Sequence, residues 1–204
     1  MKVLVACEES QKVAIAFRKK GHEAYSCDLQ DCSGGHPEWH IKDDVLRHIN
    51  DGWDMMIAHP TCTRLANSGV RWLWKPPKNR TFNDMWHELY EAVNFYIALR
   101  NANIKKKALE NPIMHKYARA MIGNIERQIV QPWWFGDKAF KATGFELFNL
   151  PELIPTNKLI PPLKDTEEYK EWSAIHRMSP GPERAKLRSK TYQGIADAIA
   201  NQWG

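Results

Sequence analysis

The chain has 204 residues, which is enough for one α/β domain with a small appendage but not for two full domains. Its 29 lysines and arginines against 24 aspartates and glutamates give a net charge of +5, which is compatible with a nucleic-acid partner without requiring one. Hydrophobic residues make up 43% and charged residues 26%, a balance that excludes wholesale disorder. No apolar run approaches the roughly 18 residues that a membrane span needs.

The first residues, Met-Lys-Val-Leu-Val-Ala-Cys-Glu-Glu, become acidic too soon for a signal peptide and predict a strand instead. The cysteines have no paired spacing, which is typical of a reducing cytosol and not of a disulfide framework. There are four of them: Cys7, Cys27, Cys32 and Cys62. We therefore expect a cytoplasmic protein that does not span a membrane.

The hydrophobic pattern of the first 30 residues predicts a β-α-β unit. Short apolar runs at 2–6 and 23–27 predict strands, and the helical spacing at 11–20 predicts a helix between them. Ser10 is the expected N-cap of this helix, and Gly21 ends it. A β-α-β unit of this length predicts a parallel sheet.

Further along the chain, strands alternate with helices and with polar loops. Residues 28–42 predict a loop and residues 63–80 a long irregular connection. Strands are expected at 53–58, 106–110, 128–131 and 144–149, helices at 83–101, 118–125 and 192–203, and an extended proline-rich segment at 151–162. We expect one α/β domain, with a core at 1–112, an irregular region at 113–190 and a closing helix at 191–204.

Cys62 follows a buried strand by four residues and precedes a loop rich in cationic residues. Nearby cations lower the pKa of a thiol and raise the thiolate fraction, so Cys62 is a candidate nucleophile. The alternative interpretation is a small buried thiol that happens to lie on a loop.

Glu110 ends another apolar strand and is followed by Asn111 and Pro112. A carboxyl group at the end of a buried strand can have a raised pKa and donate a proton, and Asn111 could orient it. The alternative is a glutamate that faces solvent in an ordinary turn.

Two acids follow other strand ends. Asp28 ends the second strand, where an acid in nucleotide-binding α/β folds commonly holds ribose hydroxyls, and Asp44 could accept from an adenine amino group. His36, His40 and Cys32 lie close in sequence, but their spacing matches no standard zinc site, so we expect no metal.

The connection at 63–80 contains no acidic residue and interleaves cations with indoles. Basic residues contact phosphates and indoles stack on bases, so the segment is a candidate nucleic-acid surface. The candidates are Arg64, Arg71, Trp72, Trp74, Lys75 and Arg80. The alternative is a solvated loop whose tryptophans pack on the core.

In its order of motifs, the chain resembles the catalytic core of the cytosine-C5 DNA methyltransferases. The segment 54–62 is similar to the family's strand and Pro-Pro-Cys loop, with Thr61 in place of the second proline. Leu109-Glu110-Asn111-Pro112 is similar to Glu-Asn-Val, and Asp28 and Asp44-Val45 lie where the family has its ribose-binding and adenine-binding acids. The resemblance implies a Rossmann-like class I methyltransferase fold, with a mostly parallel sheet and helices on both faces, in a compact, phage-like member.

The resemblance also implies a transferase activity on DNA. The Cys62 thiolate would add to C6 of a flipped-out cytosine, Glu110 would donate a proton to N3, and C5 would take a methyl group from S-adenosylmethionine. The implied cofactor-binding residues are Cys7, Glu8, Asp28, Asp44, Val45, His59 and Pro60.

Two departures from the family keep other functions open. The first loop, Ala6-Cys7-Glu8-Glu9-Ser10-Gln11, has no glycine, and residues 113–190 are too few for a full target-recognition domain. One alternative is an enzyme on the same scaffold that acts on a free pyrimidine nucleotide or a modified base, as a deoxyribosyltransferase or glycosidase does. Another is a non-catalytic DNA-binding relative.

Overall fold

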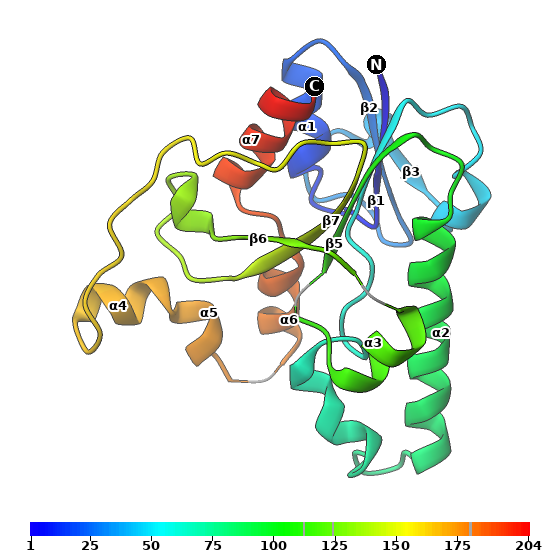
Figure 1. Ribbon diagram of the computed structural model, residues 1–204, viewed down its shortest axis with the longest axis vertical. Helices are drawn as coiled ribbons and strands as arrows, with labels where there is room; N and C mark the ends of the chain where they lie inside the picture. The colour runs from blue at the N-terminus through cyan, green and yellow to red at the C-terminus, as the bar shows by residue number, and fades with distance from the viewer. Residues whose placement is uncertain (112, 124, 180) are drawn as a thin grey trace.

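A seven-stranded sheet forms the centre of the computed structural model, which describes residues 1–111, 113–123, 125–179 and 181–204 (Figure 1). The strand order is β3-β2-β1-β4-β5-β7-β6. Strands β3, β2, β1, β4 and β5 are parallel, whereas β7 is antiparallel to both β5 and β6. The strands are β1 (Lys2–Ala6), β2 (Glu23–Asp28), β3 (His40–Lys42), β4 (Met55–Ala58), β5 (Lys106–Asn111), β6 (Gln128–Val130) and β7 (Thr143–Phe148).

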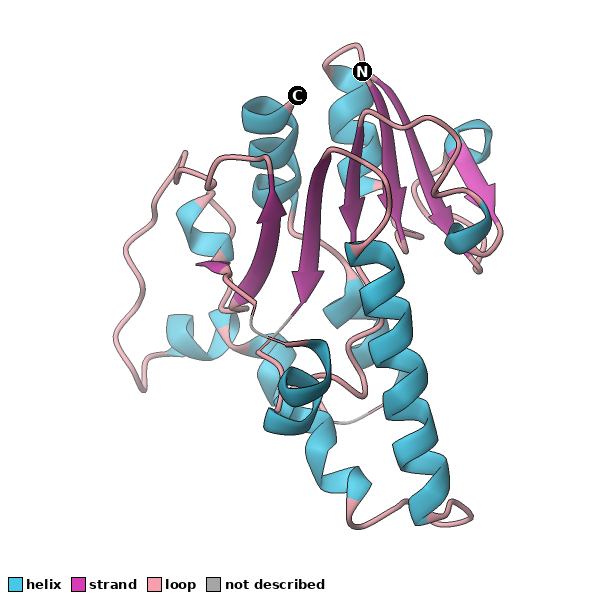
Figure 2. Cartoon of the chain, turned by 45° about the vertical axis from the view of Figure 1, so that its right-hand side comes forward, coloured by secondary structure: helices cyan, strands magenta, loops and turns pink. Residues whose placement is uncertain are grey.

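Helices cover both faces of this sheet, as Figures 1 and 2 show from two directions. Side chains alternate along a strand, so Val3 and Val5 of β1 pack with α1 and α7, whereas Leu4 packs with α2 on the opposite face. The helices are α1 (Lys12–Lys19), α2 (Phe82–Arg100), α3 (Lys116–Ile122), α4 (Glu167–Trp172), α5 (Ala174–Arg177), α6 (Pro182–Ser189) and α7 (Gln193–Trp203). The predicted fold class is therefore confirmed as an α/β, Rossmann-like fold with a mostly parallel sheet and helices on both faces.

The prediction of a loop over residues 28–42 is wrong at its end, where His40–Lys42 forms β3. This strand pairs in parallel with β2, and the Ser26 hydroxyl lies 2.8 Å from His40 Nδ1. Three residues are too short a run for a period of two to show in the sequence. The structure also places helices α4, α5 and α6 in the segment 163–190, for which the sequence predicted no helix.

Helix α1 does not begin at the predicted Ser10 cap. Its N-cap residue is Gln11, which has a left-handed backbone (φ 57°) and makes no capping bond with its side chain. The Glu8 carboxylate caps the helix instead, because its two oxygens accept from Val13 N at 2.7 Å and Ala14 N at 3.2 Å. Glu8 is only 4% exposed, so this cap is internal to the molecule.

Helix α2 begins at a capping box, in which Thr81 and Asp84 satisfy each other's backbone amides. At its other end, Tyr96 and Arg100 reach across to β7, where the Tyr96 hydroxyl donates to Glu146 at 2.8 Å and Arg100 Nε lies 2.8 Å from the other Glu146 oxygen. No helix in the described part of the chain is long and apolar enough to cross a membrane.

We predict that Glu8→Ala lowers the free energy of unfolding by about 1–2 kcal/mol, the usual cost of losing a side-chain cap. Ser10→Ala is the matched control: no hydrogen bond of the Ser10 side chain is found within the described residues, so the change should cost only a few tenths of a kcal/mol, roughly. Urea unfolding of both variants measures the difference. Equal losses in the two variants would contradict this account of the cap.

Candidate active site

The carboxyl ends of β1, β4 and β5 meet at one edge of the sheet, because these strands are parallel neighbours. The chain after β4 stays close to β1, where His59 N donates to Ala6 O at 2.9 Å. A turn follows in which the Cys62 carbonyl accepts from Leu65 N at 3.0 Å and Ala66 N at 2.9 Å. These backbone hydrogen bonds hold Cys62 at the carboxyl edge of the sheet, where open α/β sheets bind their ligands.

The Cys62 thiol is partly buried, and charged groups from three other segments of the chain act on it. Burial raises the pKa of the thiol, and Glu110 adds to this effect. Arg188 and Lys141 act in the opposite direction without overcoming the burial. The expectation that nearby cations give Cys62 a low pKa is therefore wrong in its net direction, although the cations themselves are present.

The Glu110 side chain is 13% exposed and lies between two cations. His59 Nδ1 is 2.5 Å from its Oε2, and Lys141 Nζ is 3.8 Å from its Oε1. Burial opposes ionisation, but Lys141 and His59 outweigh it and lower the pKa of Glu110 to about 2. The prediction of a raised pKa is wrong, because the sequence showed the burial of this carboxylate and not its partners.

The His59 imidazole is the counterpart of this carboxylate. Burial favours its neutral form, but Glu110, with a smaller contribution from Glu8, outweighs both burial and Lys141, so the pKa of His59 is raised. His59 Nε2 is buried and has no hydrogen-bond partner among the described residues. The sequence placed His59 among the cofactor-binding residues, whereas the structure joins it to Glu110.

Three charged residues of this site come from the second half of the chain, and the sequence assigned none of them individually. Lys141 lies just before β7 and donates to the Lys190 carbonyl at 3.2 Å. The Lys190 ammonium lies 4.0 Å from Glu9, and Arg188 of α6 acts on Cys62. In the sequence, residues 176–190 carry five lysines and arginines against one glutamate, which is a signal for the last two, but nothing there marks Lys141.

Asn111, the third predicted catalytic residue, is the last residue of β5, and its backbone pairs with Gly144 of β7. Its side chain lies outside the described part of the structure, and so does Pro112.

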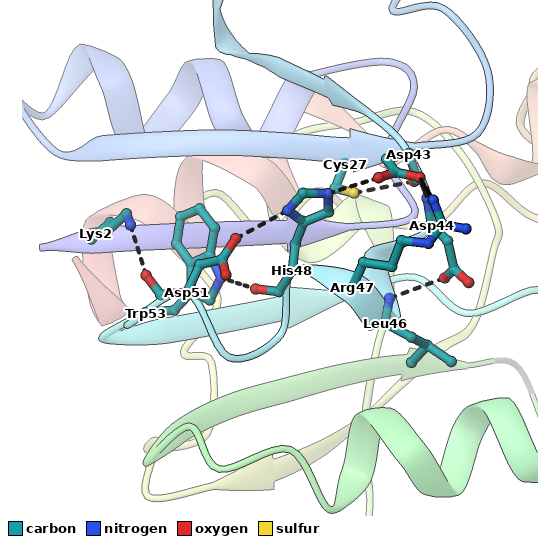
Figure 3. Close-up of polar contacts among 9 residues, drawn as sticks. All are labelled: Lys2, Cys27, Asp43, Asp44, Leu46, Arg47, His48, Asp51 and Trp53. Carbon is teal, nitrogen blue, oxygen red and sulfur yellow. Dashed lines mark hydrogen bonds and ion pairs between the residues drawn. The ribbon is translucent and has the colours of Figure 1, made fainter.

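The predicted cofactor acids also lie near the first loop. Cys7 has a left-handed backbone (φ 59°), and burial raises the pKa of its thiol, with further contributions from Asp28 and Asp44. Figure 3 shows how Asp44 is held: one carboxylate oxygen accepts from Leu46 N at 3.0 Å. Val45, in contrast, is buried in the apolar core, and Pro60 is buried after β4.

The site fits S-adenosylmethionine only in part. The carboxylates of Asp28 and Asp44 suit the hydroxyl and amino groups of its adenosine end. Its methionine end carries a carboxylate, for which the amides at the start of α1 would be the natural partners. Those amides already hold the Glu8 carboxylate, and the Cys7 and Glu8 amides donate to the Cys27 carbonyl. The methionine end therefore does not fit, and no chemical step is assigned to this cofactor.

The predicted nucleic-acid residues divide into two groups. Arg64 and Arg80 are bound to Glu88 on α2, with Arg64 Nε 2.6 Å from the carboxylate, so they brace the loop. Trp74 is 54% exposed. Its ring contacts those of Phe82, Trp86 and Tyr117. Lys75 is exposed, Trp72 is partly buried, and the Arg71 guanidinium stacks over the Trp72 ring at 4.1 Å.

Metal ligation receives no support in the part of the chain that the structure describes. No group of three or more His, Cys, Asp or Glu side chains is arranged there to hold an ion.

No family model matches the chain, and no curated protein matches it. Among solved structures, the chain is similar to a protein encoded within an E. coli prophage and provisionally described as a DNA modification methyltransferase. The two are 11% identical with a TM-score of 0.49, and the match covers 78% of this chain and 52% of the other. The chain thus spans about half the length of that protein, and the fold class rests on the strand order described above.

We predict that alkylation of Cys62 by iodoacetamide accelerates with pH beyond the ordinary titration range of a thiol, because burial raises the pKa of Cys62. Arg188→Gln should slow the reaction at pH 8, since it removes a cation that favours the thiolate. Mass spectrometry of the Cys62 peptide measures the rate, and Arg177→Gln on α5 is the control. A thiol that reacts fully at pH 6 would contradict the burial of the thiol described here.

Proposed function

We propose that the chain is a cytosine-modifying enzyme of the C5 methyltransferase type, which acts on a cytosine base in DNA through a covalent bond to Cys62. The observation that carries this proposal is the placement of the Cys62 thiol at the strand edge, within electrostatic range of Arg188, Lys141 and Glu110. Two cations favour the thiolate, and the ion pair of Glu110 with His59 offers a proton source beside it.

The chemistry begins with the thiolate. Its sulfur forms a bond to C6 of the ring, and the electron pair of the C5–C6 double bond moves towards N3, which takes a proton. C5 is then nucleophilic and bonds to an electrophile. Loss of the C5 proton and of the N3 proton restores the double bond and expels Cys62. Because the methionine end of S-adenosylmethionine meets Glu8, the proposal extends to activation of the base and leaves the methyl donor open.

A DNA base must leave the stack to reach a thiol at this edge. The exposed ring of Trp74 and the cations Arg71 and Lys75 lie on the loop after Cys62, where they could contact the strand that carries the base.

We predict that the protein exchanges the C5 hydrogen of cytosine for deuterium in D₂O, because addition at C6 lets C5 take a solvent deuteron and lose its own proton. The measurement is the loss of the H5 proton NMR signal from a cytosine-containing single strand, a duplex and deoxycytidine monophosphate. Their relative rates identify the substrate.

Cys62→Ser should abolish the exchange, whereas Cys32→Ser, which changes a thiol outside the site, should not affect it. Full exchange by Cys62→Ser, or none by the unaltered protein on any of the three substrates, would refute the proposed function.

A second candidate function is supported by one observation: the buried Glu110 carboxylate lies between Lys141 and His59, which lower its pKa. An ionised buried carboxylate is suited to attack the C1′ of a sugar, as in glycosyl transfer, and this reaction needs no methyl donor. A free pyrimidine nucleotide would then be the substrate. Release of free base from deoxycytidine monophosphate, followed by chromatography, would favour this function.

We predict that S-adenosylmethionine binds no more tightly than 5′-methylthioadenosine, which lacks the amino-acid end, because Glu8 occupies the amides that a carboxylate would use. Isothermal titration calorimetry measures both dissociation constants. A tenfold or greater preference for S-adenosylmethionine would show that the methionine end has a place in the site despite Glu8.

A further inference from the structure

The register of β4 and β5 brings His59 and Glu110 together. Ala58 pairs with Leu109 in the parallel ladder, so the next residue of each strand emerges at the same level. Met55, Ile57 and Ala108 alternate towards the face covered by α1 and α7, and the same alternation places His59 and Glu110 on that face. Their contact, 2.5 Å between His59 Nδ1 and Glu110 Oε2, follows from the backbone.

The carboxylate of Glu110 has a cationic group beside each of its oxygens. His59 Nδ1 donates to Oε2, and the ammonium of Lys141 lies 3.8 Å from Oε1. A carboxylic acid that donates a proton needs one oxygen protonated and facing its acceptor. Neither oxygen meets that condition here, so Glu110 serves as an acceptor and a counter-ion.

The imidazole of His59 is in the complementary state. Nδ1 is committed to Glu110, whereas Nε2 is buried without a partner among the described residues, and the side chain is 8% exposed. A buried N–H without an acceptor costs free energy. The unsatisfied group therefore marks a place where the acceptor comes from a ligand or from a water bound with it.

We propose that His59, and not Glu110, holds the proton that this site gives to its substrate, and that Glu110 is the positioning residue that keeps His59 charged. The acceptor is a ring nitrogen of the pyrimidine base, reached from Nε2 directly or through one water. This inference rests on the proposed function and identifies the residue that supplies its proton.

The Cys62 sulfur bonds to C6, the electron pair of the C5–C6 double bond moves to C4–C5, and that of the C4–N3 double bond moves onto N3. N3 takes the proton of His59 Nε2, which leaves a neutral imidazole. On reversal N3 returns the proton to His59, the double bond re-forms and the bond from sulfur to C6 breaks.

The charged groups around His59 determine how its pKa changes when a neighbouring residue is substituted. Glu110 and Glu8 favour the charged imidazole, whereas burial and Lys141 favour the neutral one. Removing Glu110 should therefore lower the pKa of His59, and removing Lys141 should raise it. A residue with only a packing role would not produce opposite shifts in these two variants.

The first test locates the proton without any substrate. Nitrogen-15 NMR of the labelled protein should show both ring nitrogens of His59 protonated at pH 7, with the signal assigned by its loss in His59→Gln. The titration midpoint should move down in Glu110→Gln and up in Lys141→Met. His87→Gln, on the exposed side of α2, is the control and should leave the titration midpoint of His59 unchanged. A neutral His59 at pH 7 in the unaltered protein overturns the proposal.

The second test uses the pH profile of C5 deuterium exchange. The rate should rise with pH as the thiolate fraction grows, and level off where His59 begins to lose its proton, because the product of the two fractions then stays constant. In Glu110→Gln the levelling should begin at lower pH, and in Lys141→Met at higher pH. His59→Gln should lose the levelling and fall by about 100-fold at pH 7, the usual contribution of a general acid.

A profile that keeps its levelling point in both Glu110→Gln and Lys141→Met overturns the assignment, and so does an unchanged rate in His59→Gln. A protein that exchanges no C5 hydrogen at all refutes the proposed function and the transfer to substrate. The NMR titration still reports the position of the proton in that case, so the two failures are distinguishable. If Glu110→Gln fails to fold, Lys141→Met alone carries both tests.

Discussion

The contact between His59 and Glu110 is the interaction on which the charge state of this edge of the sheet depends. Parallel pairing of β4 with β5 brings the two side chains to one level and one face, and α1 and α7 bury that face. In such surroundings neither group would remain charged alone, because burial favours the neutral form of each. Together they hold each other charged, and Lys141 further stabilises the carboxylate while opposing the charge on His59. The ionisation states thus follow from the topology of the sheet.

The antiparallel strand β7 is what makes this arrangement possible. It runs back beside β5, so the residues just before it return to the carboxyl edge and bring Lys141 to Glu110. The chain then returns through α6, where Arg188 acts on Cys62. A purely parallel sheet would direct the start of that strand to the opposite edge. The cations Lys141, Lys190 and Arg188 therefore come from a region with no motif of its own.

Apolar runs predicted the strands of the first half of the chain, because a strand buried on both faces is a continuous hydrophobic run. The three residues of β3 were missed, since they are too few to show a period. Cys62 and Glu110 were found because each follows such a run. Their ionisation was predicted wrongly, because the direction of a pKa shift depends on neighbours such as Lys141 that only the tertiary fold brings near.

The charge balance of the site limits which ligands it can bind. Glu110 is offset by His59 and Lys141, and the start of α1 is offset by Glu8, which leaves that helix end without a place for an anion. An incoming carboxylate or phosphate at that end would meet Glu8, whose own desolvation is already costly, as its raised pKa shows. A neutral heterocycle adds no charge and can accept from the unpaired His59 Nε2. The arrangement therefore favours an uncharged base beside Cys62, with any phosphate held further out, towards the cationic loop after that residue.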